Sequence, residues 1–202
     1  MKKKYILLLM LLLIIIISIC LIYRNNNKED IDIKVKYPIY KYHKLNKVIT
    51  KNINYYLKDN IDNYYFLYID YKDYEYKEYI SIVLYISYFT GGAHPNYEIK
   101  TINYNKSSNK FIDIDDLINR DKDILNKLSI YSREYFSNND MFNDKVVFDM
   151  MIDGTKSIKD NYKYFNITSD GLIIYFNRYQ IAPYYYGDYS ITISYNYLNL
   201  SI

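Results

Sequence analysis

The fold is decided by residues 74–104, which read YEYKEYISIVLYISYFTGGAHPNYEIKTINY. The first half, residues 74–89, is dense in tyrosine, isoleucine and valine, the residue types that favour pleated strands. Gly91 and Gly92 follow, and such a pair is typical of a tight turn. The stretch therefore predicts one or two strands before the turn, with residues 97–104 pairing back against them.

Two elements are predicted on the N-terminal side of this stretch. Apolar residues alternate with polar ones over residues 33–39, the period of a half-buried strand, and Pro38 favours an edge position. Apolar residues then recur at helical spacing, which predicts an amphipathic helix over residues 45–65. The apolar stripe of this helix consists of Leu45, Val48, Ile49, Ile53, Tyr56, Leu57 and Ile61.

The C-terminal side predicts a second helix and more strands. Asp115 or Asp116 is a suitable helix N-cap, and apolar residues follow at helical spacing from Ile124 to Tyr135. Residues 164–168 and 172–176 flank an Asp-Gly pair, the strongest short hairpin signal, and residues 191–195 predict the last strand. The expected class is α+β, a mostly antiparallel sheet with two amphipathic helices on one face.

Residues 5–23 carry no charge, and as a helix they have the length of the bilayer hydrocarbon, roughly 28 Å. Lys2, Lys3 and Lys4 precede them, so the positive-inside bias keeps the N-terminus in the cytoplasm. The sequence thus predicts a single-pass membrane anchor over residues 1–23, a tether over 24–32 and one extracytoplasmic domain over 33–202. Two alternatives are a cleaved signal peptide ending near Cys20 and a lipid-modified Cys20.

The charge and composition of this domain limit the classes of partner that it is expected to bind. The formal charge is +3, and once the three N-terminal lysines are set aside, basic and acidic side chains number 23 each. A neutral domain argues against nucleic acid as a partner. The 30 tyrosines suggest an adhesive surface, but an AT-rich genome also explains them, because tyrosine replaces phenylalanine or tryptophan at half-buried positions.

Three stretches carry a family resemblance: YISYFTGGAHPNY (85–97), FIDIDDLI (111–118) and FNITSDGLIIYFNRYQIAPYYYG (165–187). In this order they resemble the PdaC/RsiV-type extracytoplasmic domain, and the likeness runs from about Lys36 to the C-terminus. Two departures are Tyr185 and Tyr186, where the family usually has small residues, and Ser194, where a proline is common.

The resemblance implies a partner-binding surface, since RsiV-type proteins sense lysozyme by binding it. An anti-sigma role is not expected, because only residues 1–4 precede the apolar segment. A PdaC-type deacetylase needs a metal-binding catalytic domain, but His43 and His94 are 51 residues apart with no ligand cluster around them. The chain is therefore expected to have no catalytic residues, metal site or cofactor.

Two loops are the candidate partner-binding site. In the first loop the candidates are Gly91, Gly92 and His94, although a histidine that fixes its own loop is a competing interpretation. The second loop supplies rigid aromatic residues with hydroxyl tips, which suit contacts with proteins or glycans, although some are expected to pack on the sheet. Its candidates are Tyr179, Pro183, Tyr184, Tyr185, Tyr186 and Gly187. Asp113, Asp115 and Asp116 are interpreted as helix-capping residues rather than calcium ligands.

The sequence therefore predicts a membrane-anchored, non-catalytic binding module outside the cell. Its expected ligand is a lysozyme-like protein or a cell-wall component such as peptidoglycan. The alternative is a cell-wall-modifying enzyme that uses His94 with a nearby carboxylate, or an accessory subunit of such an enzyme.

Overall fold

The computed structural model describes residues 14–18, 31–58 and 63–202. The predicted anchor, residues 5–23, lies outside this description except for residues 14–18, which are helical. None of the helices within the described ranges combines the length and the apolar character needed to cross a membrane.

The larger of two sheets contains residues 74–104. Its strands are β1 (Asp32–Val35), β2 (Phe66–Tyr76), β3 (Tyr79–Phe89), β4 (Asn96–Asn105) and β5 (Lys110–Ile112), in that order across the sheet. The predicted antiparallel pairing is confirmed, with Ile82 of β3 opposite Ile102 of β4. β1 lies at the edge and is parallel to β2. It ends at Val35, so the predicted strand over residues 33–39 is too long, and Pro38 lies outside it.

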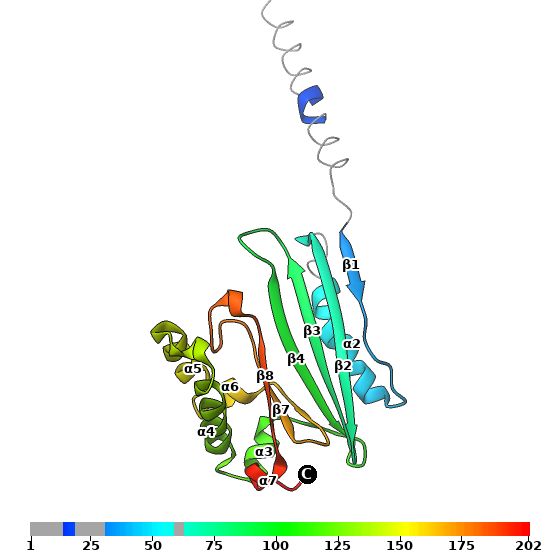
Figure 1. The fold of residues 1–202 in the computed structure, drawn as a ribbon. Helices are drawn as coiled ribbons and strands as arrows, with labels where there is room; N and C mark the ends of the chain where they lie inside the picture. Colours follow the sequence, from blue (N-terminus) through cyan, green and yellow to red (C-terminus); the bar gives the residue numbers. More distant parts are fainter. Residues whose placement is uncertain (1–13, 19–30, 59–62) are drawn as a thin grey trace, which may run out of the picture.

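Helix α2 (His43–Lys58) covers one face of this sheet (Figure 1). Its buried residues Leu45, Ile49, Ile53 and Tyr56 belong to one core cluster with Leu67, Ile82 and Leu84 of the sheet. The prediction placed the end of this helix at residue 65, which is wrong. The Tyr65 N–H already donates to the Phe89 carbonyl at 2.7 Å, so the chain there has joined the sheet.

A second sheet replaces the single sheet that was predicted. It consists of β6 (Phe165–Ile167), β7 (Leu172–Phe176) and β8 (Tyr189–Ile193), all antiparallel. The Asp-Gly hairpin between β6 and β7 is confirmed, with Ile167 opposite Leu172. The last strand ends at Ile193, because Ser194 caps the short helix α7 (Tyr195–Leu198) by accepting the Tyr197 N–H.

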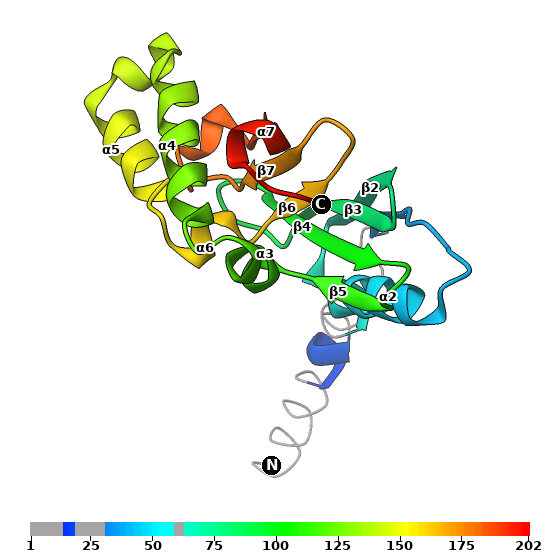
Figure 2. The ribbon, with the colours of Figure 1, turned by 90° about the horizontal axis from the view of Figure 1, so that it is seen from below.

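More helices are present than the two that were predicted, and they do not share one face. Figure 2 shows α4 and α5 on the far side of the molecule from α2. The second core joins the smaller sheet to this helical group through residues such as Leu128, Met151, Phe165 and Ile174. The group consists of α3 (Ile114–Arg120), α4 (Ile124–Ser137), the 3-10 turn η2 (Asp140–Asn143), α5 (Lys145–Gly154) and α6 (Lys159–Tyr162).

Capping explains why the predicted second helix divides into two. Asp113, rather than Asp115 or Asp116, is the N-cap of α3, and its side chain accepts the N–H groups of both those residues. The Asp116 carboxylate accepts the Asp113 N–H in return, completing a capping box. α3 ends at Arg120, and α4 begins after Asp123. Asp113 and Asp116 are therefore capping residues, as the sequence indicated, whereas the Asp115 carboxylate forms an ion pair with Lys159.

The two sheets meet along a buried polar seam. Successive residues of a strand point to opposite faces, so β3 turns Ile82 and Leu84 toward α2 and Ser81 toward β6. The Ile167 N–H of β6 donates to Ser81 Oγ at 3.0 Å. On β4, Thr101 Oγ1 accepts the Phe165 N–H at 3.2 Å, and the Asn103 amide donates to the Phe165 carbonyl at 2.9 Å. Side chains of the large sheet therefore provide hydrogen-bond partners for the backbone N–H and C=O groups of β6.

Asn166 is the residue of β6 whose side chain contributes hydrogen bonds to this seam. The side chain has no solvent exposure. Its amide nitrogen donates to the Ile82 carbonyl and to Asn103 Oδ1, both at 3.2 Å, and its oxygen accepts the Tyr175 hydroxyl at 3.1 Å. All three contacts are internal, so Asn166 ties β6 to both neighbouring strands of the large sheet.

Replacing Asn166 by alanine should lower the free energy of unfolding by roughly 1–3 kcal/mol, because Asn103, Tyr175 and the Ile82 carbonyl lose a buried hydrogen-bond partner. Urea denaturation followed by circular dichroism measures this change. Asn196→Ala is the matched control, since Asn196 is exposed on α7, and it should change stability by less than about 0.5 kcal/mol. Equal losses in the two variants would contradict the role of the seam.

Candidate functional site

The structure brings the two predicted loops together. His94 lies in the turn between β3 and β4, and Tyr184 lies in the segment between β7 and β8. Their rings stack with centroids 3.7 Å apart and an interplanar angle of 22°. The Tyr184 hydroxyl also donates to the Pro95 carbonyl at 2.8 Å. Two segments about 90 residues apart in the sequence thus form one surface.

The hydrogen bonds of His94 fix its tautomer. Nδ1 lies 3.0 Å from the Pro95 carbonyl, which can only accept, so Nδ1 carries the proton. In the neutral ring Nε2 is then an acceptor, and the Tyr179 hydroxyl lies 3.3 Å from it. Both ring nitrogens are therefore engaged within the site. This arrangement fits the interpretation in which His94 holds its own loop.

Contacts with the helical group fix the backbone of the second loop. The Gln180 amide donates to the carbonyls of Gly154 (3.1 Å) and Asn161 (3.0 Å). Ile181 and Ala182 are buried. A Cβ on Gly154 would lie 1.9 Å from the Gln180 carbonyl oxygen, so only glycine permits this close approach. These contacts hold Tyr179 in a left-handed conformation with φ of 66°.

Arg178 connects this loop to β4. Its guanidinium carbon lies 3.7 Å from the centre of the Tyr97 ring and 4.5 Å from that of Tyr184, within the range of cation–π attraction. Its Nε lies 3.5 Å from Asp188 Oδ1, an ion pair that is too poorly aligned for a hydrogen bond. Burial raises the pKa of the Asp188 carboxyl above its ordinary value, and the Arg178 charge partly opposes this shift.

The remaining candidates in the second loop lie apart from His94. Tyr185 and Tyr186 stack on each other with centroids 3.9 Å apart. Tyr185 is 75% exposed, whereas Tyr186 packs against the core of the helical group. Pro183 precedes these tyrosines, and Gly187 follows with φ of 84°. In the first loop, Gly91 and Gly92 adopt positive φ angles in the turn.

Sequence reasoning missed a cavity beside the two loops. It has a volume of about 190 Å³ and is lined by residues of β2, β3 and β4 together with Asp188. Most of these strand residues lie on the face of the large sheet opposite α2. The tyrosines that line this cavity are Tyr68, Tyr85 and Tyr97. We call the surface that they form together with Tyr179 the aromatic face. The residues lining the cavity are Tyr68, Asp70, Tyr85, Ile86, Ser87, Tyr97, Glu98, Ile99 and Asp188.

The cavity presents aromatic, hydroxyl and carboxylate groups. The cavity offers tyrosine rings and hydroxyl groups together with the carboxylates of Asp70 and Asp188. Within residues 14–18, 31–58 and 63–202, no three histidine, cysteine, aspartate or glutamate side chains are grouped to hold a metal ion. Aromatic planes bordered by hydrogen-bonding groups suit a ligand that has both apolar faces and hydroxyl or amide groups.

The tautomer of His94 can be tested directly. Nitrogen-15 NMR of the neutral imidazole should show a protonated Nδ1 and an unprotonated Nε2, because the Pro95 carbonyl requires a donor. The exposed His43 serves as an internal comparison, and its ring should show the Nε2–H form that free histidine prefers. An Nε2–H tautomer for His94 would disprove the hydrogen-bond arrangement at the loop junction.

Comparisons with known proteins relate this fold to a family. A family model described as a protein of unknown function (DUF3298) matches residues 115–196. The peptidoglycan-N-acetylmuramic acid deacetylase PdaC of Bacillus subtilis strain 168 is 32% identical over 181 residues. The alignment covers 83% of this chain but only 38% of PdaC, so this chain spans well under half the length of that relative.

Solved structures of two DUF3298 proteins share the fold. The protein from Pseudomonas aeruginosa PAO1 superimposes with a TM-score of 0.64 at 18% identity, covering 84% of this chain and 83% of that one. The protein from Bacteroides fragilis NCTC 9343 gives a TM-score of 0.51 at 19% identity, covering 77% and 60%. The resemblance inferred from the three sequence stretches is confirmed, and the chain carries a DUF3298 domain of the PdaC/RsiV type.

Proposed function

We propose that this chain is a non-catalytic binding module that acts outside the cell and binds the glycan of peptidoglycan on its aromatic face. The cavity beside Tyr85 and Tyr97 is the observation that carries this proposal. It has roughly the room of a single sugar ring. Its tyrosines provide flat apolar surfaces, and its carboxylates and hydroxyl groups provide partners for sugar hydroxyls.

The exposure of the tyrosines supports a surface that is available to a ligand. Tyr179 is 56% exposed, Tyr85 is 40% exposed and Tyr97 is 37% exposed. Tyrosine loses little conformational freedom on binding because it has only two side-chain torsions. The Arg178 guanidinium packs on the rings of both Tyr97 and Tyr184. These contacts fix the position of the Tyr97 ring before a ligand binds, so the surface is preorganised.

The proposed location rests on the N-terminal sequence. The uncharged residues 5–23 follow three lysines, the pattern of a segment that leaves the rest of the chain outside the membrane. The name of PdaC places that relative's activity on peptidoglycan, and a location outside the membrane gives this chain access to the same polymer.

A lysozyme-like protein is the second candidate ligand. The exposed tyrosines of the aromatic face favour it, because such residues are common at the centres of protein interfaces. A role as an accessory subunit of a cell-wall enzyme is compatible with the same surface. A catalytic role for His94 has less support, because the Pro95 carbonyl and the Tyr179 hydroxyl engage both ring nitrogens.

Replacing Tyr85 or Tyr179 by alanine should each weaken binding to peptidoglycan by roughly 5- to 10-fold, because each variant removes one aromatic contact. The full chain in neutral detergent is sedimented with insoluble peptidoglycan, and its binding to immobilised lysozyme is measured by interferometry. Tyr185→Ala is the matched control, since Tyr185 lies on the same loop but stacks on Tyr186.

The control variant should bind as the parent does. Peptidoglycan binding that survives both test variants, with circular dichroism showing an intact fold, would rule out the aromatic face as the glycan site. Binding to lysozyme alone, lost in the same two variants, would assign this face to a protein ligand instead.

A further inference from the structure

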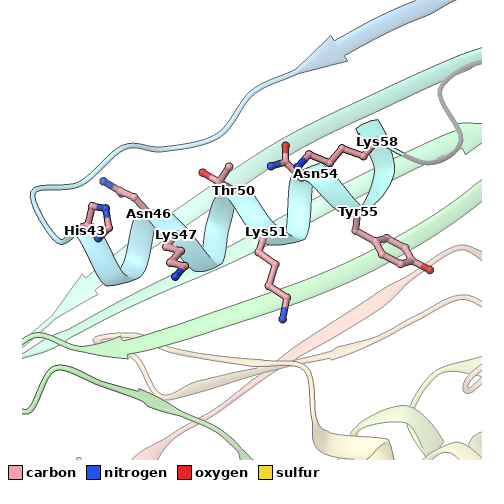
Figure 3. A pocket seen from close by; sticks show the side chains of 8 residues that line it. All are labelled: His43, Asn46, Lys47, Thr50, Lys51, Asn54, Tyr55 and Lys58. Carbon is pink, nitrogen blue, oxygen red and sulfur yellow. The ribbon is translucent and has the colours of Figure 1, made fainter.

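The outward side of α2 carries a second surface with a different chemistry (Figure 3). A shallow depression of about 790 Å³, wide open to solvent, extends along the helix, and all its described lining residues belong to α2. It is lined by His43, Asn46, Lys47, Thr50, Lys51, Asn54, Tyr55 and Lys58. Nearly every one of these side chains can donate a hydrogen bond, and none carries a negative charge. We call this surface the lysine groove.

The sequence of α2 explains why its lysines gather on one side. The apolar residues Leu45, Ile49 and Ile53 are buried against the large sheet. Lys47, Lys51 and Lys58 lie away from this apolar stripe, and all three are exposed. The 16 residues of the helix include no aspartate or glutamate, so no neighbour on the helix neutralises these lysines.

Lys100 of β4 borders the groove, and its ammonium lies 4.8 Å from the centre of the Tyr55 ring. The Glu98 carboxylate lies 3.9 Å from the same ammonium, so the positive charge of the groove comes from the lysines of α2. In the part of the chain that the structure describes, no carboxylate oxygen lies within 4.0 Å of the Lys47 or Lys51 ammonium. Concentrated positive charge of this kind stands out on a domain that is neutral in sum.

We propose that the lysine groove binds a linear polyanion bearing repeated phosphate groups. Lys47 and Lys51 are one helical turn apart, roughly 6 Å along the axis, so they meet successive charges on one chain. The groove is long and open, which suits an extended polymer. Lysines act as point charges and do not impose the bidentate geometry of arginine, so recognition depends on charge density. This surface is independent of the aromatic face.

The geometry favours a polymer over a membrane surface. A helix that lies in a bilayer interface inserts its apolar side among the lipids. The apolar side of α2 is buried against the large sheet, and among the residues that the structure describes Tyr55 is the one large aromatic residue lining the groove. The helix therefore offers charge without an apolar anchor.

Long-chain inorganic polyphosphate is the probe that tests this proposal on the full chain in neutral detergent. Affinity is measured over a range of salt concentrations for the parent and for K47Q/K51Q. Each lost phosphate contact reduces the slope of log affinity against log salt by about 0.7–0.9, so the slope should fall by roughly 1.5 in the variant. At low salt the affinity should fall on the order of 10-fold or more.

K122Q/K145Q removes the same charge from exposed positions outside the groove and should leave the salt slope unchanged. Glutamine forms helices about as well as lysine, and circular dichroism checks that the fold is intact. Tyr85→Ala and Tyr179→Ala should bind polyphosphate as the parent does, which separates this proposal from the proposed glycan site.

Competition identifies the kind of anion. Only polyphosphate should displace labelled polyphosphate when phosphate concentrations are matched. Displacement by orthophosphate would reduce the groove to a single-phosphate site, and displacement by mixed micelles of phosphatidylglycerol would assign it to a lipid surface; either overturns the proposal. Absence of polyphosphate binding, or an equal loss of slope in K122Q/K145Q, also overturns it.

Discussion

The structure depends on one constraint: the backbone of β6 is buried against the large sheet, and its polar groups need partners there. A strand enclosed in this way normally pairs edge to edge with another strand. Here its outer hydrogen bonds go to side chains instead, those of Ser81, Thr101 and Asn103. These residues allow the small sheet to lie across the face of the large sheet rather than extend it.

The position of the site follows from this seam. β7 pairs with β6, and β8 pairs with β7, so the segment between β7 and β8 is fixed once β6 is in place. The Asn177 side chain extends the same pattern, accepting the Ile99 N–H at 2.8 Å. Beyond it, Arg178, Tyr179 and Tyr184 reach the turn that carries His94. A cavity remains where the small sheet stops and the large sheet continues.

Much of the large sheet was predictable from the sequence, because its hairpin has dense strand-forming residues around a Gly-Gly turn. The apolar side of α2 and the Asp-Gly hairpin between β6 and β7 were equally predictable. The division into two sheets was not predictable, because the seam residues Ser81 and Asn103 have the polar character of solvent-facing positions. The short helices α3, α5 and α6 carry too few residues for a periodic signal.

The site was predictable only in part. The family resemblance identified both loops, but their contact depends on the seam between the sheets, which no local pattern reveals. Tyr184 and Tyr185 are adjacent and identical in type, yet one stacks on His94 and the other on Tyr186. Tyr85 and Tyr97 were missed because tyrosine is abundant on both faces of these strands, so their exposure had no distinct signal.

The proposed glycan ligand binds where the two loops meet the open end of the large sheet. Hydrogen–deuterium exchange of the full chain, with and without soluble peptidoglycan fragments, tests this most directly. Added fragments should slow exchange in residues 85–97 and 177–188 and leave α2 and α5 unchanged. Protection confined to the helical group, with none in these two segments, would contradict the account.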